Sequence, residues 1–374
     1  MRAAAMARRA TFTGWGKCVP PVKLTNADLE QLVATDSDWI VERTGIHERG
    51  ISHVETTDLA EVAALKALAA AGLAVTDIDM LILATVTPEI TCPSNACFLQ
   101  ERLGAVNAAA FDLNAACSGW IYGTATASSM IAAGVAERVL LVGAEKLHWV
   151  MDYWDRATCI LFGDGAGAAV LEPSETGEGV LAVDLGADGV AGRTIVFPTL
   201  GTRGRLSPVR DPFEHRLHFD GRAVFKIAVQ GIEASVRRAL DQSGLDLADV
   251  DAVIPHQANE RIISTAARRL GIDGHRVMLN IGTHGNSAAA SVPMALVDAL
   301  ETGLIRPGSI VVQTAFGGGV TWGSTVTRWG ERVEPLGSCD AELPACDETV
   351  FDLLAPNRDF FAPVHPGAAG DPAP

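Results

Sequence analysis

The chain has 374 residues, 48% of them hydrophobic and 20% charged, which is enough to bury a large core spread over about two domains. A net charge of −16, without a long run of Lys or Arg, argues against nucleic-acid binding. The seven cysteines show no metal-binding spacing, and the chain has neither a secretory signal nor an apolar stretch long enough to span a membrane. We therefore expect a cytoplasmic protein that holds no metal and does not enter a membrane.

Segments typical of strands and helices alternate along the chain, which favours an α/β protein with a mainly parallel sheet. In the first half, the pattern predicts helices over 57–71, 93–103 and 118–133. It predicts strands over 80–85, 108–113, 138–143, 158–162 and 167–171. In the second half, helices are predicted over 223–243, 259–270 and 291–302. Strands are predicted over 250–254, 277–280, 309–315 and 322–328.

Each half ends in a glycine-rich turn before a strand, at 163–167 and at 317–319. We interpret the two halves, 1–180 and 181–330, as an internal duplication of low sequence similarity. The long polar segment 186–219 is predicted to be a substrate-covering loop or a linker. Residues 331–374 are rich in Pro, Ala and acidic residues, so we expect this tail to be partly disordered.

Cys117 lies in the segment FDLNAACSGWIYG, where an apolar strand gives way to a helix. Unpaired N–H groups at a helix start favour the thiolate over the thiol. The small neighbours Ala116, Ser118 and Gly119 would let a substrate carbonyl reach the sulfur. This pattern alone also fits a cysteine that is simply a buried hydrophobic residue.

Two later residues extend the pattern around Cys117. His256 follows the predicted strand 250–254, and Asn286 lies in a loop rich in Gly, Ser and Ala before a helix. Cys, His and Asn at three turns between strands and helices fit a thiol-centred acyl-transfer site. Each has an ordinary alternative, because His256 could be structural and Asn286 could be a turn residue or a helix cap.

Five segments resemble the signatures of the β-ketoacyl-acyl-carrier-protein synthase III family: DLNAACSGW, LFGDGAGA, IPHQAN, HGNSAAASVP and FGGGVTWGS. DWIVERTGI near the N-terminus matches as well, and the likeness covers about residues 11–329. The resemblance implies a thiolase-like α/β fold with two similar halves. Each half would have a mixed, mainly parallel sheet, and the layers would be arranged αβαβα in a homodimer.

The resemblance implies a ketosynthase that starts fatty-acid or polyketide chains by decarboxylative Claisen condensation. Cys117 would take an acyl group from acyl-CoA or an acyl-carrier protein, and malonyl-acyl-carrier protein would lose carbon dioxide and attack it. The backbone N–H groups of Cys117 and Gly318 would form the oxyanion hole. His256 and Asn286 would donate to the enolate oxygen. This chemistry requires no cofactor.

The resemblance also implies binding residues. Trp39 and Arg156 match positions on either side of the CoA adenine, Arg43 matches one near its phosphates, and Asn259 matches one that orders water and pantetheine. The docking patch for the acidic carrier protein would comprise Lys226, Arg261, Arg268 and Arg269. The acyl pocket would include Cys92, Phe162 and Phe225. The plainer alternatives are a core Trp39, a surface ion pair at Arg156 and a solvated helix face at the docking patch.

The chain departs from the family pattern at three positions. His47 replaces an arginine and Gly50 removes another charge, which predicts weaker contacts to CoA and leaves a carrier-protein primer open. Cys92 stands where some members place a bulky Phe across the dimer, which predicts a pocket for acyl groups larger than acetyl. Two other functions stay open, an acyltransferase or head-to-head condensation enzyme on this scaffold, and a non-catalytic partner subunit. The presence of Cys117, His256 and Asn286 disfavours the partner subunit.

Overall fold

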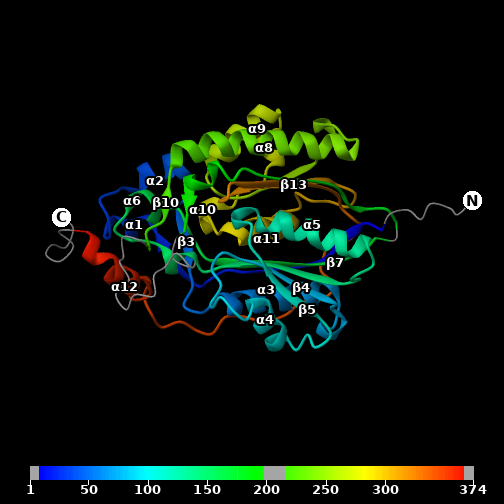
Figure 1. Ribbon diagram of the computed structural model, residues 1–374, viewed down its shortest axis with the longest axis horizontal. Coiled ribbons are helices and arrows are strands. Elements are labelled where there is room, and N and C mark those ends of the chain that lie inside the picture. Colours follow the sequence, from blue (N-terminus) through cyan, green and yellow to red (C-terminus); the bar gives the residue numbers. More distant parts are fainter. Residues whose placement is uncertain (1–7, 175, 198–214, 366–374) are drawn as a thin grey trace, which may run out of the picture.

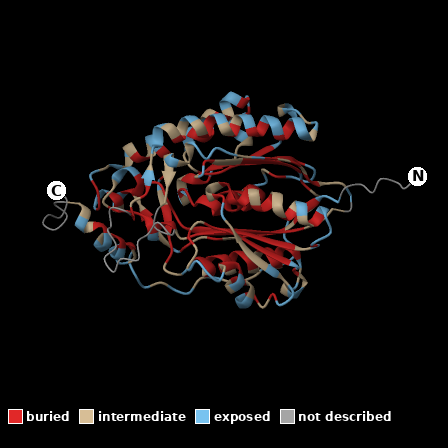
Figure 2. Cartoon of the chain, viewed as in Figure 1, coloured by how far each residue is buried: buried red, intermediate tan, exposed pale blue. Residues whose placement is uncertain are grey.

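The computed structural model describes residues 8–174, 176–197 and 215–365. Two sheets lie face to face with helices between them and on both outer sides (Figure 1). The helices α5 (Gly119–Ala132) and α11 (Ser291–Glu301) occupy the middle layer. The expected five-layer αβαβα arrangement is therefore confirmed. Figure 2 shows that buried residues concentrate in the sheets and the middle helices, while the outer helices expose one face.

The first sheet has the strand order β1-β7-β6-β4-β5. Its strands are β1 (Ala10–Cys18), β4 (Met80–Ala84), β5 (Ala109–Leu113), β6 (Val139–Glu145) and β7 (Gly165–Pro173). The central strands β4 and β6 are buried at every position, because helices cover both faces, and they are nearly continuous apolar runs. The outer face is covered by α3 (Thr56–Ala71) and α4 (Asn95–Leu103).

The second sheet has the strand order β11-β12-β13-β8. Its strands are β8 (Gly179–Ala187), β11 (Ala252–Pro255), β12 (Ile310–Gly317) and β13 (Thr321–Arg328). The outer face is covered by α8 (Gly221–Ser243) and α9 (Glu260–Leu270). The chain changes sheets between the end of β7 and the start of β8, a few residues before the predicted boundary at 180/181.

Both sheets are mixed, as expected, but antiparallel pairing has a larger share than the sequence pattern indicated. β6, β4 and β5 run parallel, as do β11 and β12. The pairings of β7 with β1 and β6, and of β13 with β12 and β8, are antiparallel. The strands β1 and β8 were not predicted, and each adds an antiparallel edge to its sheet.

Smaller elements gather at the end of the molecule that carries the site. They are β2 (Val22–Thr25), β3 (Glu48–Ile51), β9 (Ile195–Val196), β10 (His218–Phe219), α1 (Asn26–Glu30), α2 (Ser37–Thr44), α6 (Arg156–Cys159) and α10 (Ile281–His284). The predicted strand 158–162 is wrong, because Asp155 caps α6 through its side chain and the apolar residues that follow pack as a helix and turn. The predicted strand 277–280 is also wrong, since only Val277 forms a bridge, to Val253. Short apolar runs do not distinguish a buried helix from a strand.

The tail contains a helix that the sequence pattern did not predict. Residues 331–365 are described and contain α12 (Val350–Phe361) and the short 3-10 helix η8 (Ala362–Val364). Thr349 and Asp352 form a reciprocal cap at the start of α12, and Leu354 on its inner face is fully buried. The expectation of partial disorder in the tail stays a prediction, because 366–374 lie outside the described residues, as does part of the predicted loop, 198–214. Within the described ranges, no helix has the length and apolar character needed to cross a bilayer.

Candidate active site

A cavity of about 1020 Å³ opens at the junction of the two halves and is lined from both of them. Cys117, His256 and Asn286 all line it, although each comes from a different connection between elements. Its other lining residues include Trp39, Val86, Leu147, Arg156, Phe162, Ile195, Phe197, Phe219, Arg222, Phe225, Asn259, Arg261, Gly317 and Gly318. The cavity thus combines an apolar chamber with a rim of cations.

Cys117 lies in the 3-10 helix η2 (Ala116–Ser118), directly before α5. The end of β12 approaches it so closely that a Cβ on Gly317 would lie 2.6 Å from the backbone nitrogen of Cys117, so only glycine fits there. Among the described non-glycine residues, only Ala116 and Ala288 have positive φ, 49° and 41°. Both flank the site, where strained backbone commonly holds a reacting group in place.

The thiol of Cys117 is less acidic than an ordinary cysteine. Burial raises the pKa of Cys117 to about 12, with a contribution from the Glu145 carboxylate, whereas the backbone N–H groups of Cys117 and Gly318 lower it. Its side chain is partly exposed only because it faces the cavity. The backbone N–H groups at the helix start therefore lower the pKa of Cys117, as predicted, but burial raises this pKa by more. The predicted oxyanion donors, Cys117 and Gly318, do face the sulfur.

His256 follows β11, and its backbone N–H donates to Thr314 O at 2.8 Å. The residue is 4% exposed, and burial lowers the pKa of His256 to about 3, so the imidazole is neutral near neutral pH. Its Nδ1 has no hydrogen-bond partner within the described residues. A neutral imidazole whose tautomer is not fixed by a partner can either accept a proton or donate one.

Asn286 is held in a fixed orientation by its backbone and its side-chain oxygen. Its N–H donates to Leu161 O at 2.9 Å, and its carbonyl accepts from Gly163 N at 3.0 Å. Its Oδ1 accepts from Ala288 N at 3.0 Å, which leaves the Nδ2 hydrogens for the cavity. Asn286 is a turn residue, which was the ordinary alternative to a catalytic role. The turn also directs the Nδ2–H donor toward the cavity, and this donor does not titrate.

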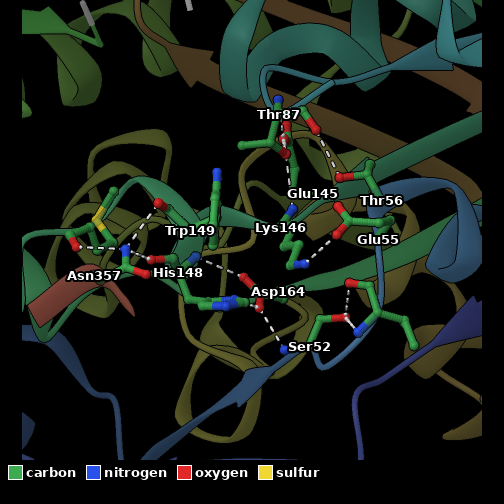
Figure 3. Close-up of polar contacts among 12 residues, drawn as sticks. Ser52, Glu55, Thr56, Thr87, Glu145, Lys146, His148, Trp149, Asp164 and Asn357 are labelled. Atoms are coloured by element: carbon green, nitrogen blue, oxygen red, sulfur yellow. Dashed lines mark hydrogen bonds and ion pairs between the residues drawn. The ribbon is translucent and has the colours of Figure 1, made fainter. Parts of the chain in front are cut away.

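Glu145, at the end of β6, is a buried carboxyl group that the sequence did not single out. It accepts from Thr87 Oγ1 at 2.6 Å (Figure 3). It also accepts from Ala289 N at 3.3 Å, so it ties the turn after β4 to the loop of Asn286. Burial raises the pKa of Glu145 to about 7, although hydrogen bonds from Thr87, Val86 and Ala289 lower it. The only signal in the sequence was a charged residue at the end of an otherwise apolar strand.

The pH dependence of alkylation tests the state of the Cys117 thiol. We expect its rate with iodoacetamide to rise about tenfold per pH unit from about pH 7 to 10, because only the thiolate reacts and the pH stays below the pKa. Peptide mass spectrometry separates Cys117 from the other cysteines. A rate that is already flat near neutral pH would mean that the helix start outweighs burial.

The proposed CoA residues are arranged around Trp39. The guanidinium carbons of Arg156 and Arg43 lie 4.6 and 4.9 Å from its ring centroid, and Arg156 also donates to Ala34 O at 2.9 Å. Arg156 thus stacks directly on Trp39, and an adenine could enter between them only if one side chain moved. Asn259 caps α9 through Oδ1 and donates through Nδ2 to Arg43 O, which leaves its second Nδ2 hydrogen available.

The proposed docking residues are all exposed, with Lys226 on α8 and the three arginines on α9. Only Arg261 lines the cavity, while Arg269 lies 3.6 Å from Glu233 and is partly neutralised by it. Arg222 also lines the mouth and was missed, although it stands one helical turn before Lys226.

The structure separates the three proposed acyl-pocket residues. Phe162 and Phe225 line the cavity, whereas Cys92 is exposed and does not line it in the single chain. Phe197 and Phe219 were missed as lining residues, although they lie in the segment predicted to cover the substrate. Gly50 is buried in β3, where an added Cβ would lie 3.0 Å from Pro20 Cδ, and its effect on CoA binding stays a prediction.

A thiol before a buried helix, a neutral imidazole and an amide donor in one cavity of a five-layer αβαβα fold define a thiol-dependent condensing enzyme of the thiolase type. The family model described as 3-oxoacyl-[acyl-carrier-protein (ACP)] synthase III matches residues 111–189, and the model of its C-terminal part matches 240–329. The chain belongs to the β-ketoacyl-acyl-carrier-protein synthase III family.

Individual relatives match over nearly their whole length. Beta-ketoacyl-[acyl-carrier-protein] synthase III 2 of Vibrio cholerae is 45% identical over 92% of this chain and 95% of its own. The synthase III of Desulfitobacterium hafniense is 48% identical over 86% of this chain and 98% of its own. The crystal structure of the Aquifex aeolicus synthase III superposes with a TM-score of 0.81 at 41% identity, covering 86% of this chain and 100% of that one. The priming β-ketosynthase of the R1128 polyketide pathway gives 0.82 at 31% identity, covering 88% and 99%.

Proposed function

We propose that the protein is a ketosynthase that condenses an acyl thioester primer with malonyl-acyl-carrier protein and so starts fatty-acid or polyketide chains. The observation that carries the proposal is the convergence of Cys117, His256 and Asn286 on one enclosed cavity. A nucleophile and two hydrogen-bond donors around one space are what a condensation through a covalent intermediate requires.

Acylation comes first. Because the Cys117 thiol holds its proton tightly, neutral His256 accepts that proton as the sulfur attacks the thioester carbonyl. The N–H groups of Cys117 and Gly318 stabilise the oxyanion that forms. The carbon–sulfur bond of the donor then breaks, and its thiolate leaves with the proton from His256. The product is an acyl thioester on Cys117.

Condensation follows. The carbon–carbon bond to the malonyl carboxylate breaks, carbon dioxide leaves, and the electron pair moves onto the thioester oxygen as an enolate. Asn286 Nδ2–H donates to that oxygen, and so does neutral His256 in the tautomer that carries the proton on the ring nitrogen facing the cavity. The enolate carbon attacks the acyl group, and the Cys117 thiolate leaves and takes up a proton from water. No electrons are gained or lost overall, so we propose that the enzyme uses thioester substrates without a resident cofactor.

We propose a homodimer because one sheet edge is incompletely covered. β5 lies at the edge of the first sheet and is the only strand there without a buried residue. Such an edge offers unpaired backbone groups to a second copy. Exposed Cys92 would then reach the cavity of the partner chain, as the family resemblance suggests. We place the enzyme in the cytoplasm, where thiols stay reduced.

For the carrier protein, we propose docking at the cavity mouth. Arg222, Lys226 and Arg261 are exposed on α8 and α9, and Arg222 and Arg261 also line the cavity. The chain has a net charge of −16, so its overall charge does not attract an acidic partner. The cations at the cavity mouth can attract such a partner locally. Arg268 and Arg269 extend the same helix face away from the mouth.

The test is the product formed from a panel of acyl-CoA and acyl-carrier-protein primers with malonyl-acyl-carrier protein. We expect a β-ketoacyl-carrier protein in the mass spectrum and one carbon dioxide released per product. Acyl transfer to the carrier protein without carbon dioxide release would contradict condensation and favour the acyltransferase alternative.

A further inference from the structure

The C-terminal tail lies beyond the residues that the family models match, which end at 329. Its helix α12 (red in Figure 1) lies at the end of the molecule that carries α1, α2 and α6. Val350 and Leu354 of α12 are buried in one hydrophobic cluster with Leu147 and Phe162, which line the cavity. The tail therefore packs behind the wall of the acyl chamber.

A buried amide clamps the tail to that wall. Asn357 is 3% exposed, and its Nδ2 donates to the carbonyl oxygens of His148, Trp149 and Met151 at 2.8, 2.9 and 3.0 Å (Figure 3). These carbonyls belong to the 3-10 helix η3 (Leu147–Val150) and its cap Met151, and the carbonyl of His148 also accepts from Met151 N at 3.1 Å. The clamp fixes η3, and with it Leu147, in the cavity wall.

The tail also contacts residues 215–217, which precede β10. Arg216 Nε lies 3.0 Å from Asp152 Oδ2, and His365 Nε2 of the tail donates to the same oxygen at 2.8 Å. The ring of Phe360 on α12 packs edge-on against His215, with centroids 5.6 Å apart. Leu217 is buried in the same cluster as Leu354.

These contacts continue directly into the chamber. Residues 215–217 run into β10, which pairs with β9. Phe219 of β10, Ile195 of β9 and the adjacent Phe197 all line the cavity, and Phe197 packs edge-on against Phe162. The tail thus supports two walls of the chamber, one through η3 and one through the β9–β10 pair.

We infer that α12 is a brace that determines which acyl groups the chamber accepts, an inference that rests on the proposed function. An apolar pocket selects acyl groups by size according to how far its wall residues can be displaced. Wall residues that pack tightly against a helix are displaced only at a high cost. Without the brace, Leu147, Phe197 and Phe219 can move outward, and longer acyl groups enter at smaller cost.

Acylation of Cys117 by acetyl-CoA and octanoyl-CoA tests this inference in full-length variants. We expect Asn357→Ala to raise the octanoyl-to-acetyl ratio of kcat/KM at least about fivefold. Phe351→Ala, an exposed change on the same helix, is the matched control and should leave the ratio unchanged. Alkylation of Cys117 at the wild-type rate verifies that the catalytic centre is intact.

His365→Ala provides a second, milder variant, because it leaves the Asn357 clamp in place and removes the contacts of the His365 ring to Asp152 and Trp154. We expect a smaller shift in the same direction. An unchanged ratio in the folded His365→Ala and Asn357→Ala proteins, or an equal shift in Phe351→Ala, overturns the brace even if stability falls. If the wild-type protein forms no acyl-enzyme with any thioester, the proposed function fails instead, which is a separate result.

Discussion

Replacing Cys117 by alanine should abolish the acyl-enzyme and reduce condensation by about 10⁵–10⁶-fold, the scale of losing a covalent nucleophile. Of the seven described cysteines only Cys117 lines the cavity, so none of the others is placed to take over its role. The change removes a single atom from a side chain that faces a cavity, so we expect the fold to persist.

Intact-protein mass spectrometry after incubation with acyl-CoA measures the effect. Wild-type protein should gain one acyl mass, which hydroxylamine removes, and the Cys117→Ala protein should gain none. Cys97→Ala is the control, since Cys97 is an exposed free cysteine outside the cavity, and it should acylate normally. A thioester adduct that forms on the Cys117→Ala protein at the wild-type rate would place the nucleophile elsewhere.

The position of Cys117 was predictable because its signal is local. A strand, a turn of small residues and a helix follow one another in the sequence, and each has a recognisable pattern. The chemical state of the thiol was not predictable in this way. The helix start favours the thiolate, but burial and the Glu145 carboxylate come from tertiary packing, and they decide the pKa.

The meeting of His256 and Asn286 with Cys117 depends on long-range contacts. Asn286 reaches the cavity because its backbone bridges to Phe162, more than a hundred residues earlier. Nothing in the local pattern around Asn286 specifies that bridge. The residues alone therefore left the role of Asn286 open, and its role as a hydrogen-bond donor to the enolate was inferred from the family signatures. The structure then supplied the orientation, through the hydrogen bond from Ala288 to Oδ1.

The strand β1 was missed because two of its glycines resemble strand breakers. Gly14 and Gly16 face α3, where an added Cβ would collide with the backbone carbonyls of Ala67 and Ala63. The helix packs so tightly on the strand that only glycine fits at these two positions. In the sequence alone, glycines at such positions indicate a break in a strand. The helix α12 was missed because the tail is rich in Pro and acidic residues, and its few buried residues, such as Leu354 and Asn357, give only a weak helical pattern.

Replacing Asn286 should separate the two half-reactions. We expect Asn286→Ala to form the acyl-enzyme nearly normally, because Cys117, Gly318 and His256 perform that step. Release of carbon dioxide from malonyl-acyl-carrier protein should fall about 10²–10³-fold, the usual cost of one lost donor to a developing oxyanion. Acyl-enzyme mass and carbon dioxide release, measured on the same preparation, report the two steps separately.

Asn286→Asp is the matched variant that distinguishes donation from turn geometry. A carboxylate oxygen at this position can still accept from Ala288 N, so the turn that holds residue 286 is retained. The variant has no N–H to donate, and its negative charge opposes the enolate. If donation is the role of Asn286, the Asp variant decarboxylates no faster than the Ala variant. If the Asp variant released carbon dioxide at the wild-type rate, Asn286 would serve only to shape the turn, and the enolate would depend on His256 alone.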